Sequence, residues 1–166
     1  MNHKGILIFF CGKMGSGKST LSRKMSEELN AILLSEDEWL STIYPEEIQN
    51  FDDYIKYSRR LKPLLKIHVR NILKAGLSVV MDFPANTINQ RVWFKEIFLF
   101  ENIPHKLIYL DVDDKTCLEG IRKRRQTNPE RAQFDTEDVF QHVTSFFQPP
   151  SPDEGFFIEV VHRDAS

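Results

Sequence analysis

The segment GKMGSGKS, residues 12–19, has the composition of a loop that binds phosphate. It fits the pattern G-x-x-x-x-G-K-[ST], with Gly12 and Gly17 as its two fixed glycines. Glycine backbones can turn successive N–H groups toward one anion, and a helix that begins here adds positive charge at its N-terminus. Lys18 can reach the β- and γ-phosphates of a nucleotide, and the Ser19 hydroxyl can hold Mg²⁺. The residues of this predicted P-loop are Gly12, Lys13, Met14, Gly15, Ser16, Gly17, Lys18, Ser19 and Thr20.

The elements predicted on either side of this segment support the same interpretation. Residues 6–11 form a continuous apolar run, which is typical of a strand buried on both faces. Residues 19–29 carry apolar side chains at helical spacing. A glycine-rich turn that arose by chance would rarely lie between such a strand and such a helix, so phosphate binding is favoured.

The segment SEDEW, residues 35–39, supplies candidates for a general base. Its acids also suit the first turn of a helix, where the dipole stabilises negative charge. Glu38 fits a capping box with Ser35 and is explained in that way. Asp37 remains the better candidate for a carboxylate that takes a proton from an acceptor hydroxyl.

A second carboxylate, Asp82, follows the apolar run in LSVVMDF. Because ligands of parallel sheets lie beyond the carboxyl ends of the strands, we expect Ser19, Asp37 and Asp82 to converge on one metal–phosphate centre. Asp82 would hold a metal-bound water or the acceptor hydroxyl. Phe83 stands where motor-type ATPases carry a Glu, and the chain has no Asn-Lys-x-Asp guanine signature. A small kinase is therefore favoured over a motor ATPase or a GTPase.

An arginine-rich segment, GIRKRRQTNPERAQF, completes the candidate machinery. Basic residues at a helix end are often solvated and suit the helix dipole. This run, however, follows the helix after the fourth predicted strand and precedes a loop with Pro129. We predict a lid over about residues 122–136 that brings guanidinium groups over the phosphates. Arg124 is the first choice for this role and Arg125 the second.

Short apolar runs alternate with helical patterns along the chain, which predicts an α/β protein with a parallel sheet covered by helices on both faces. Pro63 lies inside one helical pattern, so we expect a break or kink near Lys62. Gly76 is expected just past the end of that helix. The further strands are predicted at residues 31–34, 77–81, 106–112 and 156–161, and the further helices at 35–43, 53–75, 88–100, 114–125 and 136–147.

The composition fits one domain over residues 1–166, with 41% hydrophobic and 28% charged residues. A formal net charge of −2 provides no global attraction to nucleic acid or to an acidic membrane. Cys11 and Cys117 do not make a disulfide framework and are expected to be buried. The first apolar run is too short for a signal peptide, and no run approaches the length of a membrane span. We expect a cytoplasmic protein.

Several segments together resemble the small bacterial P-loop kinases, which are AAA-domain ATP-binding proteins related to polynucleotide 5′-kinase, chloramphenicol phosphotransferase and the zeta-toxin kinases. These segments are the P-loop, SEDEW, VVMDFPANT, CLEGIRKRR and PPSPDEGF, and the resemblance covers nearly the whole chain. It implies a three-layer α/β/α fold with a five-stranded parallel sheet of order 2-3-1-4-5. It also implies ATP with Mg²⁺ as the phosphoryl donor.

The resemblance also implies roles for single residues. The residues implied are Lys18 and Ser19 at the phosphates, Asp37 as the base, Asp82 in the acceptor site and Arg124 in the lid. Asn86 and Arg91 match the spacing Asp-x-x-x-Asn…Arg of the polynucleotide kinases, which places them in the acceptor site. Those kinases have an Arg directly before the base, whereas this chain has Glu36. Glu36 would repel an anionic polynucleotide end, so nucleic acid is the disfavoured acceptor.

We therefore predict an ATP-dependent phosphotransferase that moves the γ-phosphate to a hydroxyl of a small molecule, with Mg²⁺ at Ser19 and, through water, at Asp37. The alternatives are a polynucleotide 5′-hydroxyl kinase and a non-catalytic protein whose partner affinity depends on nucleotide. A basic stripe on the predicted helix 53–75 is interpreted as a solvated outer face rather than as an anion-binding wall. This stripe consists of Arg59, Lys62, Lys66 and Arg70. The acceptor and the oligomeric state are left open.

Overall fold

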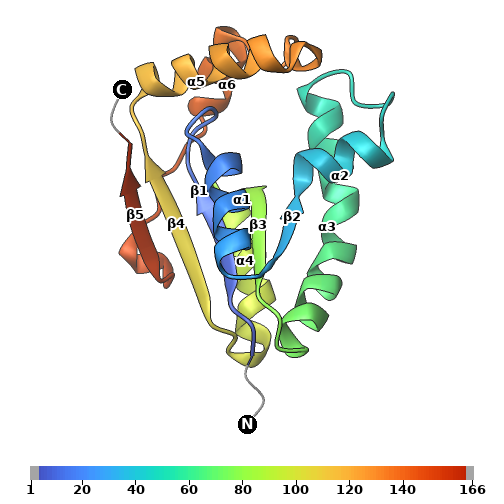
Figure 1. The fold of residues 1–166 in the computed structure, drawn as a ribbon, viewed down its shortest axis with the longest axis vertical. Coiled ribbons are helices and arrows are strands. Elements are labelled where there is room, and N and C mark those ends of the chain that lie inside the picture. The colour runs from blue at the N-terminus through green and yellow to red at the C-terminus, as the bar shows by residue number, and fades with distance from the viewer. Residues whose placement is uncertain (1–3, 164–166) are drawn as a thin grey trace.

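Five parallel strands form one sheet in the order β2-β3-β1-β4-β5 (Figure 1). The computed structural model describes residues 4–163. The strands are β1 (Leu7–Cys11), β2 (Ile32–Ser35), β3 (Val79–Pro84), β4 (His105–Asp111) and β5 (Ile158–His162). This order confirms the fold that the resemblance implied. Since all strands run in one direction, their carboxyl ends lie along a single edge of the sheet.

Helices cover both faces of this sheet. They are α1 (Lys18–Glu28), α2 (Glu36–Ile43), α3 (Phe51–Lys74), α4 (Ile88–Phe98), α5 (Asp114–Thr127) and α6 (Glu137–Thr144). Single 3₁₀ turns occur at Leu99–Glu101, Pro129–Arg131 and Pro152–Glu154. Helices α3 and α4 contribute to the hydrophobic cluster on one side of the sheet, and α5 and α6 to the cluster on the other. Figure 1 shows α5 lying across the carboxyl ends of the strands.

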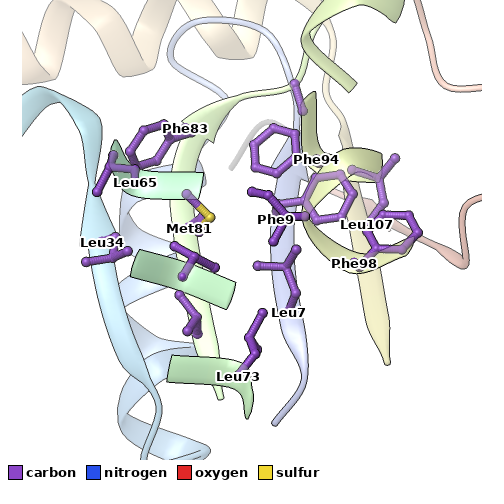
Figure 2. Packing of buried hydrophobic residues seen from close by; sticks show 14 of the residues in the cluster. Leu7, Phe9, Leu34, Leu65, Leu73, Met81, Phe83, Phe94, Phe98 and Leu107 are labelled. Atoms are coloured by element: carbon purple, nitrogen blue, oxygen red, sulfur yellow. The ribbon is translucent and has the colours of Figure 1, made fainter. Parts of the chain in front are cut away.

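The central strand β1 is buried on both faces, as its continuous apolar sequence predicts. Leu7 and Phe9 point into the cluster beneath α3 and α4, whereas Ile8 and Phe10 point to the opposite face. The ring of Phe9 stacks on that of Phe94 with 4.3 Å between centroids (Figure 2). This packing fixes the strand from which the P-loop emerges.

Helix α3 is continuous through Pro63, so of the predicted break or kink near Lys62 the break does not occur. Its buried stripe of leucines and valine packs on the sheet, and this packing outweighs the cost of one proline on the exposed side. Gly76 follows the helix with φ 88°, as expected at that position. Both cysteines are free and buried, which confirms that prediction.

Strand β3 extends further than the sequence pattern predicts. It ends at Pro84 rather than at Met81, because parallel pairing with β2 continues until Ser35 lies beside Asp82 and pairing with β1 brings Phe10 beside Pro84. Asp82 is therefore held by the sheet itself.

Within residues 4–163, no helix combines the length and the apolar character that crossing a membrane requires.

Candidate functional site

The P-loop joins β1 to α1 at the carboxyl edge of the sheet. Gly15 and Gly17 have φ values of 78° and 98°, in the left-handed region that favours glycine. A Cβ atom on Gly15 would lie 2.2 Å from the carbonyl oxygen of Cys117 in α5. The loop therefore needs glycine both for its backbone conformation and for the close approach of α5.

Lys18, the first residue of α1, folds back over this loop. Its Nζ donates to the carbonyl oxygens of Gly12 and, at 3.3 Å, of Lys13. Burial lowers the pKa of this ammonium, and nearby Asp82 opposes that shift. The buried Ser16 hydroxyl has no hydrogen-bond partner among the described residues. A buried polar atom without a partner fits a loop that a phosphate ligand would complete.

A cavity of about 390 Å³ opens beside the P-loop. Its lining contains the hydroxyl of Ser19 and the carboxylates of Asp37 and Asp82, which the sequence predicted to converge. The structure brings them together because β2 and β3 are neighbours and end at the same edge of the sheet. The other lining residues are Ser22, Arg23, Leu33, Ser35, Glu38, Ser41, Glu130 and Arg131.

The two aspartates of this cavity have different surroundings. Burial raises the pKa of Asp82, while the Ser19 hydroxyl and the Lys18 ammonium beside it act in the opposite direction. The Asp37 side chain is 49% exposed, and its Oδ2 lies 3.5 Å from Nη1 of Arg131. Asp82 thus lies against the P-loop, and Asp37 lies further out, where an incoming molecule could reach it.

Glu36 does not face this cavity, which corrects the expectation that it would repel an anionic acceptor. It is only 1% exposed and points toward α3. One carboxylate oxygen accepts a hydrogen bond from the Tyr54 hydroxyl, and the other accepts one of 3.0 Å from the Ser58 hydroxyl. Ser35 caps α2 through the Glu38 N–H at 3.4 Å, without the reciprocal side-chain bond of a capping box within the described residues.

The predicted lid segment is folded against the same cavity. Arg124 binds the carboxylate of Asp135 through two hydrogen bonds of 2.9 and 2.5 Å. Arg131 lies between Asp135 and Asp37. Arg125 lies on another side of α5, where it lines a separate cavity and donates to the Asp135 carbonyl oxygen at 3.4 Å.

Arg131 and Asp135 were not selected from the sequence. Arg131 belongs to the arginine-rich segment, but its position after Pro129 did not distinguish it from the others. Arg131 and Asp135 pair at i, i+4 outside any described α-helix, so helical spacing gave no signal for this ion pair.

Asn86 and Arg91 lie behind the P-loop and not in the cavity. The Oδ1 atom of Asn86 accepts a 2.9 Å hydrogen bond from the Gly12 N–H. Arg91 is fully buried, with its Nε 2.8 Å from Glu154 and its Nη1 2.9 Å from the carbonyl oxygen of Ala85. Helix α4 turns the Arg91 side chain toward the sheet. Arg91 is therefore part of the buried structure and lies where an acceptor could not touch it.

The basic stripe of α3 packs along α4. Lys66 pairs with Glu96 at 2.7 Å, and Arg70 lies over the ring of Phe100 at 4.5 Å. Lys62 lies over the ring of Trp93 at 5.5 Å. Lys62, Lys66 and Arg70 are partly buried by these contacts, so the expected solvated face is found only at Arg59. The contacts within the chain also argue against an anion-binding wall.

A comparison with family models finds one match, described as an AAA domain, over residues 7–150. No curated protein matches the chain. Among solved structures, the APS kinase CysC of Mycobacterium tuberculosis, in complex with AMPPNP and APS, has a TM-score of 0.66 at 19% identity, covering 98% of this chain and 91% of that one.

Two further structures have the same fold. Kti12 of Chaetomium thermophilum, in complex with ADP-AlF3, has a TM-score of 0.66 at 15% identity over 93% of this chain and 88% of that one. An unliganded sugar kinase from Janibacter sp. has a TM-score of 0.62 at 16% identity over 96% and 85%. At these sequence identities, the structural likeness establishes the fold alone.

Proposed function

The chain belongs to the AAA-domain family matched above, and on this premise we propose that it is an ATP-dependent kinase that phosphorylates a hydroxyl of a small molecule. The observation that carries the proposal is the single cavity in which Ser19, Asp37 and Asp82 meet beside the P-loop. A nucleotide-binding loop alone would fit many activities. A partly exposed carboxylate opposite that loop fits a base for an acceptor.

The P-loop would hold the phosphates of ATP, with Lys18 leaving its carbonyl partners for the β- and γ-phosphates. Mg²⁺ would be held by the Ser19 hydroxyl and, through water, by Asp37, and Asp82 would lie nearby. Oxygen atoms of hydroxyls, carboxylates and water are the ligands that Mg²⁺ prefers. Bound there, the ion would neutralise phosphate charge. Among residues 4–163, no group of three or more His, Cys, Asp or Glu side chains is arranged to hold a metal by itself.

The proposed reaction uses Asp37 as the general base. The acceptor oxygen attacks the γ-phosphorus while an Asp37 carboxylate oxygen takes the hydroxyl proton, and the bond from the γ-phosphorus to the bridging oxygen breaks to release ADP. Lys18 and the lid arginines would stabilise the charge on the transferred group. Asp37 suits this role better than Asp82, because Asp82 is turned toward Ser19 and Lys18.

A screen with γ-labelled ATP over nucleosides, sugars, antibiotics and oligonucleotides tests the proposal. With an acceptor in hand, Asp37→Asn should lower kcat by about 10²–10⁴-fold while calorimetry finds Mg·ATP affinity nearly unchanged. Lys18→Ala should weaken both binding and transfer. Unchanged turnover in Asp37→Asn would remove it as the base.

A polynucleotide 5′-hydroxyl kinase is the second candidate, because the burial of Glu36 removes the repulsion that argued against it. Label transferred to oligonucleotide ends, with steep salt dependence of binding, would favour this candidate. Nucleotide binding without a phosphorylated product from any acceptor would instead support a nucleotide-gated binding protein.

A further inference from the structure

Asp135 is a buried carboxylate at the end of the proposed lid segment, directly before α6. Its side chain is 0% exposed. Oδ1 accepts a hydrogen bond from Nη2 of Arg124 at 2.5 Å, and Oδ2 accepts from Nε of Arg124 at 2.9 Å and from Nε of Arg131 at 3.3 Å. One carboxylate therefore holds two guanidinium groups that come from different parts of the lid.

Each of these guanidinium groups keeps N–H donors that Asp135 does not use. A guanidinium has donors on more than one edge of a rigid plane, so fixing the Nε edge also fixes the direction of the others. The free edge of Arg131 faces the cavity, since its Nη1 lies 3.5 Å from Asp37 Oδ2.

The charge of Arg124 acts on the same centre. Burial has the largest influence on the pKa values of Lys18 and Asp82, and the Arg124 charge contributes to lowering both. The Arg124 charge thus acts on the P-loop lysine and on the inner carboxylate, and Arg131 lies beside the outer one.

We propose that Asp135 is a positioning residue that orients Arg124 and Arg131 toward the phosphoryl group as it is transferred. The inference rests on the proposed kinase function and adds a residue that does not itself touch the substrate. Two guanidinium groups aimed at one place repel each other, and a shared buried carboxylate offsets that repulsion. Arginines held in this way need no reorganisation when charge develops in the transition state.

A comparison of two ligands separates positioning from a purely structural role. Arginines that act on the transferring group should contribute little to the affinity for Mg·ADP and much to the affinity for Mg·ADP with aluminium fluoride, which mimics that group. Calorimetry measures both affinities without an acceptor. In Asp135→Asn, we expect the affinity for Mg·ADP with aluminium fluoride to fall by about tenfold or more. A fall of this size corresponds to the loss of one charge-assisted interaction.

The matched control is Asp138→Asn, the same chemical change at an exposed position of α6. It should leave both affinities at the wild-type values. In Asp135→Asn, an unchanged ratio of the two affinities, with the variant folded by its melting curve, would overturn the proposal. Equal losses for both ligands would also overturn it, because a general distortion of the site would then explain the result.

If Asp135→Asn does not fold, the two arginines provide the test. Arg124→Gln and Arg131→Gln should each reduce the aluminium fluoride affinity, and the double variant should lose less than the product of the two single effects, since both depend on Asp135. Independent effects would contradict a shared anchor. If the wild-type protein binds Mg·ADP but transfers label to no acceptor in the γ-labelled ATP screen, the proposed function itself fails, and that outcome is distinct from failure at Asp135.

Discussion

Glu36 and Asp37 are adjacent carboxylates that α2 sends in different directions. Successive helical residues point about 100° apart, so Glu36 turns toward Tyr54 and Ser58 while Asp37 lies in the cavity. One acid is removed from water, and the other remains half exposed. Asp37 was selected from SEDEW because Glu38 was assigned to the cap, but nothing in the sequence predicted the burial of Glu36, since both acids suit the first turn of a helix.

The burial of Glu36 predicts a pH-dependent stability. Burial raises the pKa of Glu36 above its ordinary value of 4.5, although the bonds from Tyr54 and Ser58 oppose that shift. The folded protein therefore favours the protonated form. Its contribution to the free energy of unfolding is fully present below pH 4.5 and is lost as the pH rises through the raised folded pKa.

We expect Glu36→Gln, which resembles the protonated form, to gain stability relative to wild type between about pH 4.5 and pH 7.5. Urea unfolding at the two pH values measures the difference. Glu38→Gln, at an exposed position, should show no such trend. A Glu36→Gln difference from wild type that is the same at both pH values would contradict the interpretation.

At the scale of elements, α5 is packed directly on the P-loop. A Cβ atom on Gly120 would lie 2.5 Å from the carbonyl oxygen of Gly15. The same helix carries Arg124, which Asp135 holds in place. The P-loop backbone and Arg124, the first arginine of the proposed lid, are therefore fixed to each other by a glycine–glycine contact.

This contact predicts that Gly120→Ala displaces the P-loop. A methyl group cannot fit against a backbone oxygen at this distance, so the loop or the helix must shift, and we expect Mg·ATP affinity to fall by about tenfold or more. Calorimetry measures the affinity. Lys123→Ala, at an exposed position of the same helix, serves as the control. Wild-type affinity in folded Gly120→Ala would show that α5 does not support the loop.

At the scale of the whole molecule, the segment between α6 and β5 returns to the P-loop. Gln148 donates its backbone N–H to the Asn86 carbonyl oxygen at 2.8 Å, and Asn86 in turn accepts from Gly12 at 2.9 Å. Glu154 pairs with the buried Arg91 of α4. Parts of the chain distant in sequence thus support the loop through Asn86 and hold α4 through Arg91.

Removal of the Arg91 guanidinium should destabilise the fold. Arg91→Met leaves Glu154, which is largely buried, without its partner, and we expect the free energy of unfolding to fall by about 3–5 kcal/mol. Urea unfolding measures this loss. Adding Glu154→Gln should restore part of the stability, because no uncompensated charge then remains.

The more exposed pair of Lys106 and Glu159 provides the comparison, since Lys106→Met should cost about 1 kcal/mol or less. Equal effects at the two ion pairs would show that the burial of Arg91 adds nothing. A folded and fully stable Arg91→Met would contradict the supporting role given to Arg91.

The sequence by itself determined the P-loop, the alternation of strands and helices, and the meeting of Ser19, Asp37 and Asp82. Each of these depends on local spacing together with the rule that ligands lie at the carboxyl edge of a parallel sheet. The strand order came from the resemblance, and the structure confirmed it.

Only the tertiary structure decided where Glu36, Arg91 and Asp135 point. Their roles depend on partners that are distant in the chain or in another element, namely Tyr54 in α3 for Glu36, Glu154 beyond α6 for Arg91, and Arg124 in α5 for Asp135. No local pattern encodes such a pairing. A charged side chain is removed from water only where packing brings its partner to it, and that packing is a property of the assembled sheet and helices.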